Sequence, residues 1–236
     1  KALDRMLLER NTTLREIDLS GNLSLTESGF GNLMFNRTID TLIINGCPGS
    51  VSDATVQQLS CMSNLTCLHV SGNDLTYSAL LCLKHSNITE LDVSYNHITD
   101  EGAVIIVQHP SIRKLNMASN QVTWIGAREL FQSKMLEELD LSNNANVDDS
   151  TSSTFSYLEK NGALRHLELA NIRAICRRET LDVLLNRNEC LEYINLRGTQ
   201  LGADLSQSYI NRSKLDYKLN NLKYLGLLDD DDDDSE

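Results

Sequence analysis

Two short pairs of residues carry side chains with metal-binding chemistry. Cys67 and His69 are two residues apart, and Glu90 and Asp92 have the same spacing 23 residues later. Thiolate, imidazole and carboxylate groups are the usual protein ligands of zinc. On neighbouring strands these side chains would face the same way, but two rungs of a flat sheet rarely converge on a tetrahedral site. We therefore expect a polar surface here, with no metal and no cofactor.

Motifs for catalysis are not visible in the sequence. The chain contains no phosphate-binding loop, no H-E-x-x-H and no G-x-S-x-G. Its five histidines are scattered. A cysteine nucleophile would need a nearby base and a cleft, and the pattern supplies neither. We expect that the chain is not an enzyme.

The elements that must position these residues belong to a repeat. The stretch "ITELDVSYNHI", residues 88–98, has the pattern L-x-x-L-x-L-x-x-N, which is the leucine-rich-repeat signature. Positions one, four and six are apolar in every copy, although only 41% of the chain is hydrophobic. Nine copies, 23 to 31 residues apart, begin at residues 14, 39, 65, 88, 112, 136, 164, 191 and 222.

The pattern predicts an α/β solenoid in the form of a horseshoe. Leu91 and Val93 point inward from a short strand, while Glu90 and Asp92 point outward. Stacked repeats would pair these strands into a parallel sheet on the concave side. The segments at 99–109 and 122–133 have helical spacing, so we place helices on the convex side.

The ninth position of each copy predicts a column of turn-stabilising side chains. Asn96 can bond peptide groups that the turn leaves inside the stack, where an unpaired group is costly. Because the last members depart from asparagine, we expect a less regular stack from about residue 145. The column is Asn22, Cys47, Asn73, Asn96, Asn120, Asn144, Ile172, Thr199 and Asp230.

Composition bounds the domains and the partners. We predict one leucine-rich-repeat domain over residues 1–228 and a disordered acidic tail over 229–236. The tail carries seven of the 33 acidic groups, so the remaining 26 face 21 basic residues and the body is only mildly acidic. We therefore expect a monomer that binds no nucleic acid, and no apolar run is long enough for a membrane span. The six cysteines do not cluster at either end, which favours free thiols in a reducing compartment.

The positions between the core residues predict what the sheet presents to a partner. Acidic side chains dominate the middle strands and two tyrosines lie near the end, a composition that suits protein recognition. Acidic residues at the fifth position also have local roles in such repeats, and ordinary solvated residues are the alternative. The predicted contacts are Glu90, Asp92, Lys114, Asn116, Glu138, Asp140, Glu168, Tyr193 and Tyr224.

Several stretches resemble a known subtype of the repeat. "ALDRMLLERNTTLREIDLSGN", "ITDEGAVIIVQHPSIRKLNMASNQV" and "WIGARELFQSKMLEELDLSNN" resemble ribonuclease-inhibitor-like leucine-rich repeats. The Gly-Ala pairs at 102–103 and 126–127 are similar to the subtype found in effectors that intracellular bacterial pathogens inject into host cells. The acidic run after the last copy is also similar to Ran GTPase-activating protein and to acidic nuclear phosphoproteins.

The resemblance implies a protein-interaction module in a cytosol. We expect a partner protein on the concave sheet, and a bacterial effector acting on a host protein, in the host cytosol, is the favoured version. The alternative is a cytosolic regulator of a small GTPase, which would need a polar catalytic loop near the N-terminal repeats. No such loop is visible here.

Overall fold

The chain folds into two compact units. A computed structural model describes residues 10–148, 154–172, 174–210 and 222–227. These residues belong to unit 1, Lys1–Asn120, and unit 2, Gln121–Glu236. The predicted acidic tail lies outside the described residues, so the predicted domain boundaries stay a prediction.

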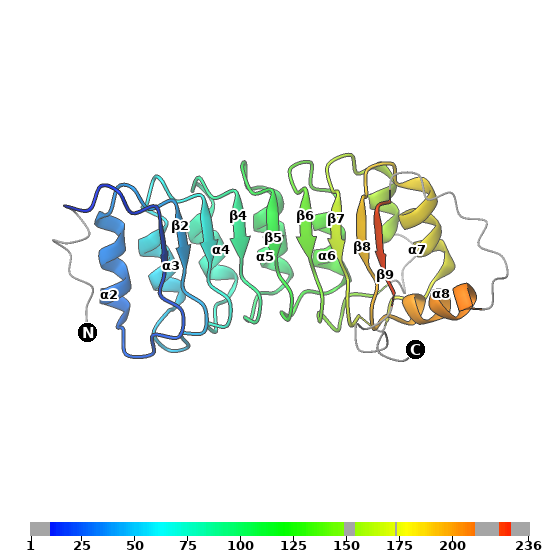
Figure 1. Cartoon of the computed structure of the whole chain (residues 1–236), viewed down its shortest axis with the longest axis horizontal. Coiled ribbons are helices and arrows are strands. Elements are labelled where there is room, and N and C mark those ends of the chain that lie inside the picture. The colour runs from blue at the N-terminus through cyan, green and yellow to red at the C-terminus, as the bar shows by residue number, and fades with distance from the viewer. Residues whose placement is uncertain (1–9, 149–153, 173, 211–221, 228–236) are drawn as a thin grey trace. The chain divides into compact units, whose positions relative to one another are not determined.

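Unit 1 alternates short parallel strands with helices. Five strands of its described part pair in chain order, and the helices lie on one side of them (Figure 1). The strands are β1 (Glu16–Asp18), β2 (Thr41–Ile43), β3 (Cys67–His69), β4 (Glu90–Asp92) and β5 (Lys114–Asn116). The helices are α2 (Glu27–Gly31), the 3₁₀ helix η1 (Asn32–Phe35), α3 (Asp53–Leu59), α4 (Tyr77–Leu83) and α5 (Asp100–Val107).

Unit 2 has the same alternation with less regular helices. Its described strands also pair in parallel and in chain order: β6 (Glu138–Asp140), β7 (His166–Glu168), β8 (Tyr193–Asn195) and β9 (Tyr224–Gly226). The connecting elements are α6 (Trp124–Phe131), the 3₁₀ helix η2 (Phe155–Lys160), α7 (Arg178–Asp182), the π-helix η3 (Val183–Arg187) and α8 (Gln200–Ile210). After residue 145 the helical segments thus become less regular, as expected for the stack, whereas the strands keep their register.

The core includes the three predicted apolar positions of each copy together with apolar residues of the helices. In the seven copies that begin between residues 39 and 191, positions one, four and six are all buried. In the first and last copies they are half-buried, as for Ile17 and Leu225. The terminal strands β1 and β9 each have one paired neighbour among the described residues, so less of their apolar surface is covered.

The predicted helices form where capping and packing agree. Thr99 is the N-cap of α5 and Asp100 and Glu101 fill its first turn, where negative charge is favourable. The Gly-Ala pair that follows is buried, and a Cβ on Gly102 would lie 2.4 Å from Ile98 Cγ2 and 2.8 Å from Leu80 Cδ1. Glycine at this position therefore allows α5 to pack closely on α4.

The predicted asparagine column is present and bridges successive repeats. Asn96 Oδ1 accepts from the backbone amides of Asn73 and Leu75, and Asn96 Nδ2 donates to the carbonyls of Val70, Val93 and Ser94. Asn73, Asn120 and Asn144 make equivalent bonds to neighbouring turns. Each buried amide thus satisfies peptide groups of two repeats at once.

A second polar column, which the sequence pattern did not reveal, lies three residues before several of the copies begin. Asn161 Nδ2 donates to the carbonyls of Phe131 and Ser133, while its Oδ1 accepts from the amides of Ala163 and Leu164. Asn36 and Asn188 bond in the same way. This second column fastens the turns at the opposite ends of the strands.

His109 takes the place of asparagine in the second column. Its side chain is buried, its Nε2 is 3.0 Å from the Leu83 carbonyl oxygen, and its Nδ1 accepts from the Ser111 amide. Burial lowers the pKa of His109, the nearby His85 lowers it further, and the Leu83 carbonyl opposes the change. The neutral ring therefore satisfies both neighbours.

The remaining observations concern thiols and membranes. The six cysteines are not joined in disulfides. Cys47 is buried in the asparagine column, and the others are half-buried or exposed. In the part of the chain that the structure describes, no helix is long and apolar enough to cross a membrane.

Removal of a buried column amide should destabilise unit 1 strongly. Asn96→Ala deletes five hydrogen bonds and leaves buried peptide groups unpaired, so we expect a loss of roughly 3 kcal/mol in the free energy of unfolding. Urea denaturation measures it. Asn22→Ala is the matched control, because Asn22 holds the same column position but is exposed. Equal losses in the two variants would contradict the role of the column.

Replacement of His109 should flatten the pH dependence of stability. In the unfolded chain the His109 pKa is about 6.5, and in the folded chain it is lower. Below about pH 6.5 His109 is therefore protonated in the unfolded state while it stays neutral in the folded state, so the free energy of unfolding falls as the pH drops. His109→Asn supplies the same donor and acceptor without titrating. Thermal melts from pH 7.5 to 5 should show a smaller loss in this variant, and parallel profiles would refute the assignment.

Candidate functional site

The strands place their outer residues on one exposed face. Each described strand has three residues, and in β2 to β8 the middle side chain is buried while its two neighbours are half-buried or exposed. These neighbours are the third and fifth positions of the repeat. The parallel registers align them into two columns within each unit.

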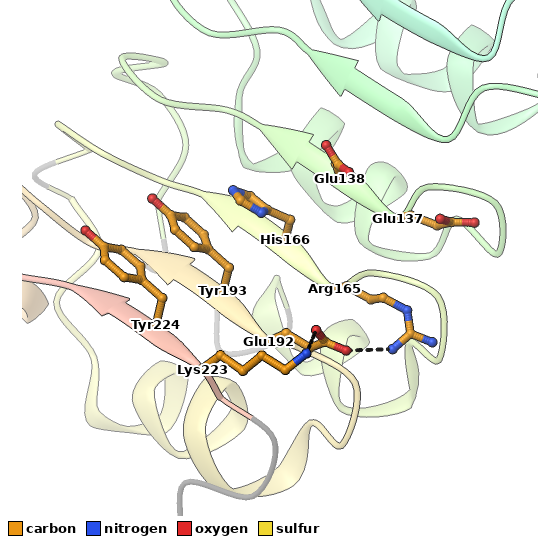
Figure 2. Close-up of a pocket in the computed structure, with 8 residues that line it drawn as sticks. All are labelled: Glu137, Glu138, Arg165, His166, Glu192, Tyr193, Lys223 and Tyr224. Atoms are coloured by element: carbon orange, nitrogen blue, oxygen red, sulfur yellow. Dashed lines mark hydrogen bonds and ion pairs between the residues drawn. The ribbon is translucent and has the colours of Figure 1, made fainter.

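Three aromatic rings stack along the third-position column of unit 2. His166 and Tyr193 have ring centroids 3.8 Å apart with planes at 12°, and Tyr193 and Tyr224 are 4.4 Å apart at 6°. These spacings follow the distance of about 4.8 Å between neighbouring strands, and Figure 2 shows the rings in a row on β7, β8 and β9. We call these three residues the ring stack. Burial raises the pKa of Tyr193, and the Glu168 carboxylate adds to the increase.

Charged side chains border the ring stack. Arg165 and Lys223 both bind the Glu192 carboxylate, and these contacts, with the Lys223 hydrogen bond foremost, lower the pKa of Glu192 (Figure 2). The rings, these charges and the Glu137 and Glu138 side chains line a pocket of about 330 Å³. At the other end of the rings, Arg197 Nη2 donates to the Tyr224 hydroxyl over 3.2 Å.

The predicted contacts fall into two groups, one in each unit. Unit 1 holds four of them: Glu90, Asp92, Lys114 and Asn116, where β4 and β5 pair side by side. Unit 2 holds the other five: Glu138, Asp140, Glu168, Tyr193 and Tyr224. The structure thus brings Tyr193 against Tyr224, and Asp140 beside Glu168 in register.

The fifth-position residues have a structural role. Oδ1 of Asp92 accepts from the Ser94 amide at 2.9 Å, and Oδ1 of Asp140 accepts from the Ser142 amide at 2.8 Å. Asn116 and Asn195 make the same bond with an amide oxygen. These side chains cap the turn after the strand, so their occurrence at the fifth position follows from local geometry.

His166 is part of the site although the prediction did not include it. Its third-position column, which also holds Tyr193 and Tyr224, can be read from the sequence. Side chains that pair across neighbouring strands contact each other, so the aromatic ring of His166 one repeat before Tyr193 could have predicted the contact. Its Nε2 also lies 3.3 Å from Glu168 Oε1, which connects the ring stack to the acidic side chains.

A separate cluster lies on the exposed face of unit 1. Cys67 Sγ is 3.4 Å from His69 Nε2, and His69 Nε2 is 3.1 Å from Glu90 Oε1. All three ligand atoms lie within 4.8 Å of one another. Burial raises the pKa of the Cys67 thiol to about 11, with the Glu90 charge as the next cause. Three of the four residues of the two pairs thus lie close together, whereas Asp92 is not part of this group.

Comparison with known proteins supports the repeat and its fold. Residues 10–26, 61–84, 84–106 and 132–150 match the family model described as Leucine Rich repeat. The structure is similar to a chain in the crystal structure of the yeast Rad7 and Elc1 complex, with 15% identity, a TM-score of 0.54, and coverage of 84% of this chain and 66% of that one. A comparison with curated proteins finds no match.

A second solved structure gives a weaker likeness. It is a plant ice-binding protein, with 14% identity, a TM-score of 0.47, and coverage of 72% of this chain and 52% of that one. The chain thus spans less than two thirds of the length of either solved structure. Parallel strands that alternate with helices in each unit, together with the four matched segments, show an α/β solenoid fold of the leucine-rich-repeat type.

Asp140 should tolerate loss of its charge but not loss of its oxygen. Asp140→Asn keeps the Oδ1 acceptor that Asn116 and Asn195 use, so we expect its unfolding free energy to stay within about 0.5 kcal/mol of wild type. Asp140→Ala loses the cap and should cost about 1 kcal/mol. Urea denaturation separates the two. If both variants lost the same stability, charge rather than capping would be the cause.

Proposed function

We propose that this chain is a protein-interaction module, without catalytic activity of its own, that binds a partner protein on the exposed face of its strands. The observation that carries the proposal is the ring stack. His166, Tyr193 and Tyr224 hold an imidazole and two phenol rings in a row whose spacing is fixed by β7, β8 and β9. Tyrosine is enriched at the energetic centres of protein interfaces.

The surroundings of the ring stack favour a protein over a small molecule. Pockets for small ligands are mostly apolar and occupy about 300 to 1,000 Å³. This pocket is at the small end of that range, and five of its eight lining residues are charged. An aromatic centre with a charged rim is instead the usual anatomy of a protein interface.

Rigid placement of the rings adds to this argument. Stacked neighbours restrict each other's rotamers. Binding of a partner would therefore cost less side-chain entropy of these rings than it would if they were mobile. The solved structure of similar fold contains Rad7 in complex with Elc1. Its likeness supports the fold, and the fold is compatible with a protein partner.

The finer roles rest on the sequence resemblance alone. The Gly-Ala pairs motivate a bacterial effector in the host cytosol, and the acidic residues 229–236 motivate a GTPase regulator. Close packing around Gly102 gives the first Gly-Ala pair a structural reason of its own. The two roles differ in their partner: a GTPase regulator would accelerate nucleotide hydrolysis by the protein it binds, whereas an effector that only holds its host target would not.

Loss of the tyrosine rings should weaken partner binding. A protein retained from a eukaryotic cytosolic lysate is identified and purified, and its affinity is measured by biolayer interferometry. Tyr193→Ala/Tyr224→Ala should weaken binding about 30-fold, which corresponds to one interfacial hot spot of about 2 kcal/mol. Asp140→Asn removes a fifth-position charge but keeps the cap of the turn, so it tests separately whether the acidic side chain contributes to binding.

Tyr157→Ala is the matched control for this experiment. Tyr157 lies in the same unit on η2, away from the strands, and its exposed fraction of 38% is close to the 39% of Tyr224. It should bind like wild type. A Tyr157 variant as weak as the double variant, or a double variant of wild-type affinity, would overturn the proposed binding face.

A further inference from the structure

The cluster of Cys67, His69 and Glu90 in unit 1 has no part in the ring stack. Among the residues that the structure describes, it is the group of three potential metal ligands whose ligand atoms all come together. From this geometry we propose that Cys67 Sγ, His69 Nε2 and a Glu90 carboxylate oxygen bind a zinc ion on the exposed face of β3 and β4.

The distances are close to those of a tetrahedral zinc site. With Zn–S of about 2.3 Å and Zn–N and Zn–O of about 2.0 to 2.2 Å, tetrahedral angles place sulfur about 3.5 to 3.7 Å from a nitrogen or oxygen ligand, and nitrogen about 3.3 to 3.6 Å from oxygen. The Sγ–Nε2 distance of 3.4 Å and the Nε2–Oε1 distance of 3.1 Å fall slightly short of these ranges. Small rotations of two side chains would therefore complete the site without movement of the strands.

The strands hold the ligands for reasons independent of a metal. Cys67 and His69 flank the buried Leu68 on β3, so they project on the same side. Register places Cys67 directly beside Glu90 on β4. Since the backbone positions are fixed by the core, a metal would bind a largely preorganised site.

The local charge favours a cation. Glu90, Glu16 and Asp40 place negative charge around the Cys67 side chain. When a divalent ion binds, the thiol releases its proton to solvent, a Zn–S bond forms, and the metal charge compensates the carboxylates. The His69–Glu90 ion pair, with side chains 26% and 41% exposed, contributes little by itself.

The donor set selects zinc over the common hard cations. Magnesium and calcium prefer six or more oxygen ligands, whereas thiolate and imidazole prefer zinc. Three protein ligands leave one tetrahedral position, and the partial exposure of His69 and Glu90 lets water reach it. The site would thus be an open one rather than a closed structural site.

Cobalt substitution tests the site directly. The full chain, stripped of metal, is titrated with Co²⁺ under reducing conditions and then with Zn²⁺. We expect one equivalent of tetrahedral cobalt with a sulfur-to-metal charge-transfer band, which zinc displaces. His69→Gln and Glu90→Gln should weaken zinc binding by at least about 100-fold, since even second-shell partners contribute 10- to 100-fold.

Two matched controls make the outcome specific. His97→Gln removes an exposed histidine of unit 1 that pairs with Asp74, and Cys61→Ser removes an exposed thiol of the same unit. Both should bind zinc like wild type, and the metal-free variants should melt like the metal-free wild type. Absence of a sulfur-to-cobalt band, its loss in Cys61→Ser, or unchanged affinity in His69→Gln and Glu90→Gln would each overturn the proposal.

Discussion

The structure depends on the hydrogen bonds that buried asparagine amides make between successive turns. A strand of three residues forms few backbone hydrogen bonds with its neighbours. The peptide groups of the turn that follows the strand point into the interior. Asn96 satisfies peptide groups of two repeats with one side chain, and Asn161 does the same at the opposite ends of the strands in unit 2. With both ends of the strands held, each core side chain stacks on the equivalent side chain of the next copy. Where Ile172 replaces asparagine, the side chain is buried but cannot make such a bond, and the helices around it include the 3₁₀ helix η2 and the π-helix η3 as well as α7.

The fixed register of the parallel strands aligns equivalent positions of successive repeats into columns on one surface. Because the strands cannot slip, Tyr193 lies between His166 and Tyr224 at stacking distance. The same constraint sets Cys67 beside Glu90 in unit 1. The two sites have different chemistry but the same structural basis. In both, side chains that lie outside the core are held in place by strands whose register the core fixes. The backbone therefore fixes the geometry of both sites, while the outward-facing residues of the strands would decide what they bind.

Much of the fold follows from the period of the sequence, and less of the site does. Apolar positions one, four and six and the asparagine column could be predicted because burial leaves few residue types that fit. The left-handed backbone at position eight could not, since it is occupied by Tyr95 and Ser119 as well as by glycine and asparagine. The second column could not be predicted for a similar reason, because His109 and Asn161 satisfy equivalent peptide groups of different repeats with different side chains. Convergence of Cys67, His69 and Glu90 depends on side-chain rotamers, which the spacing of residues does not encode.

Hydroxyl-radical footprinting of the chain with and without its purified partner tests the central claim most directly, because it reports the exposure of individual side chains. The account predicts that the partner lowers the oxidation of Tyr193, Tyr224 and His166, while Tyr157 and Tyr77, which lie on helical segments, react at unchanged rates. Protection of Tyr157 or Tyr77 with the ring stack unprotected would contradict the account and would assign binding to the helical segments.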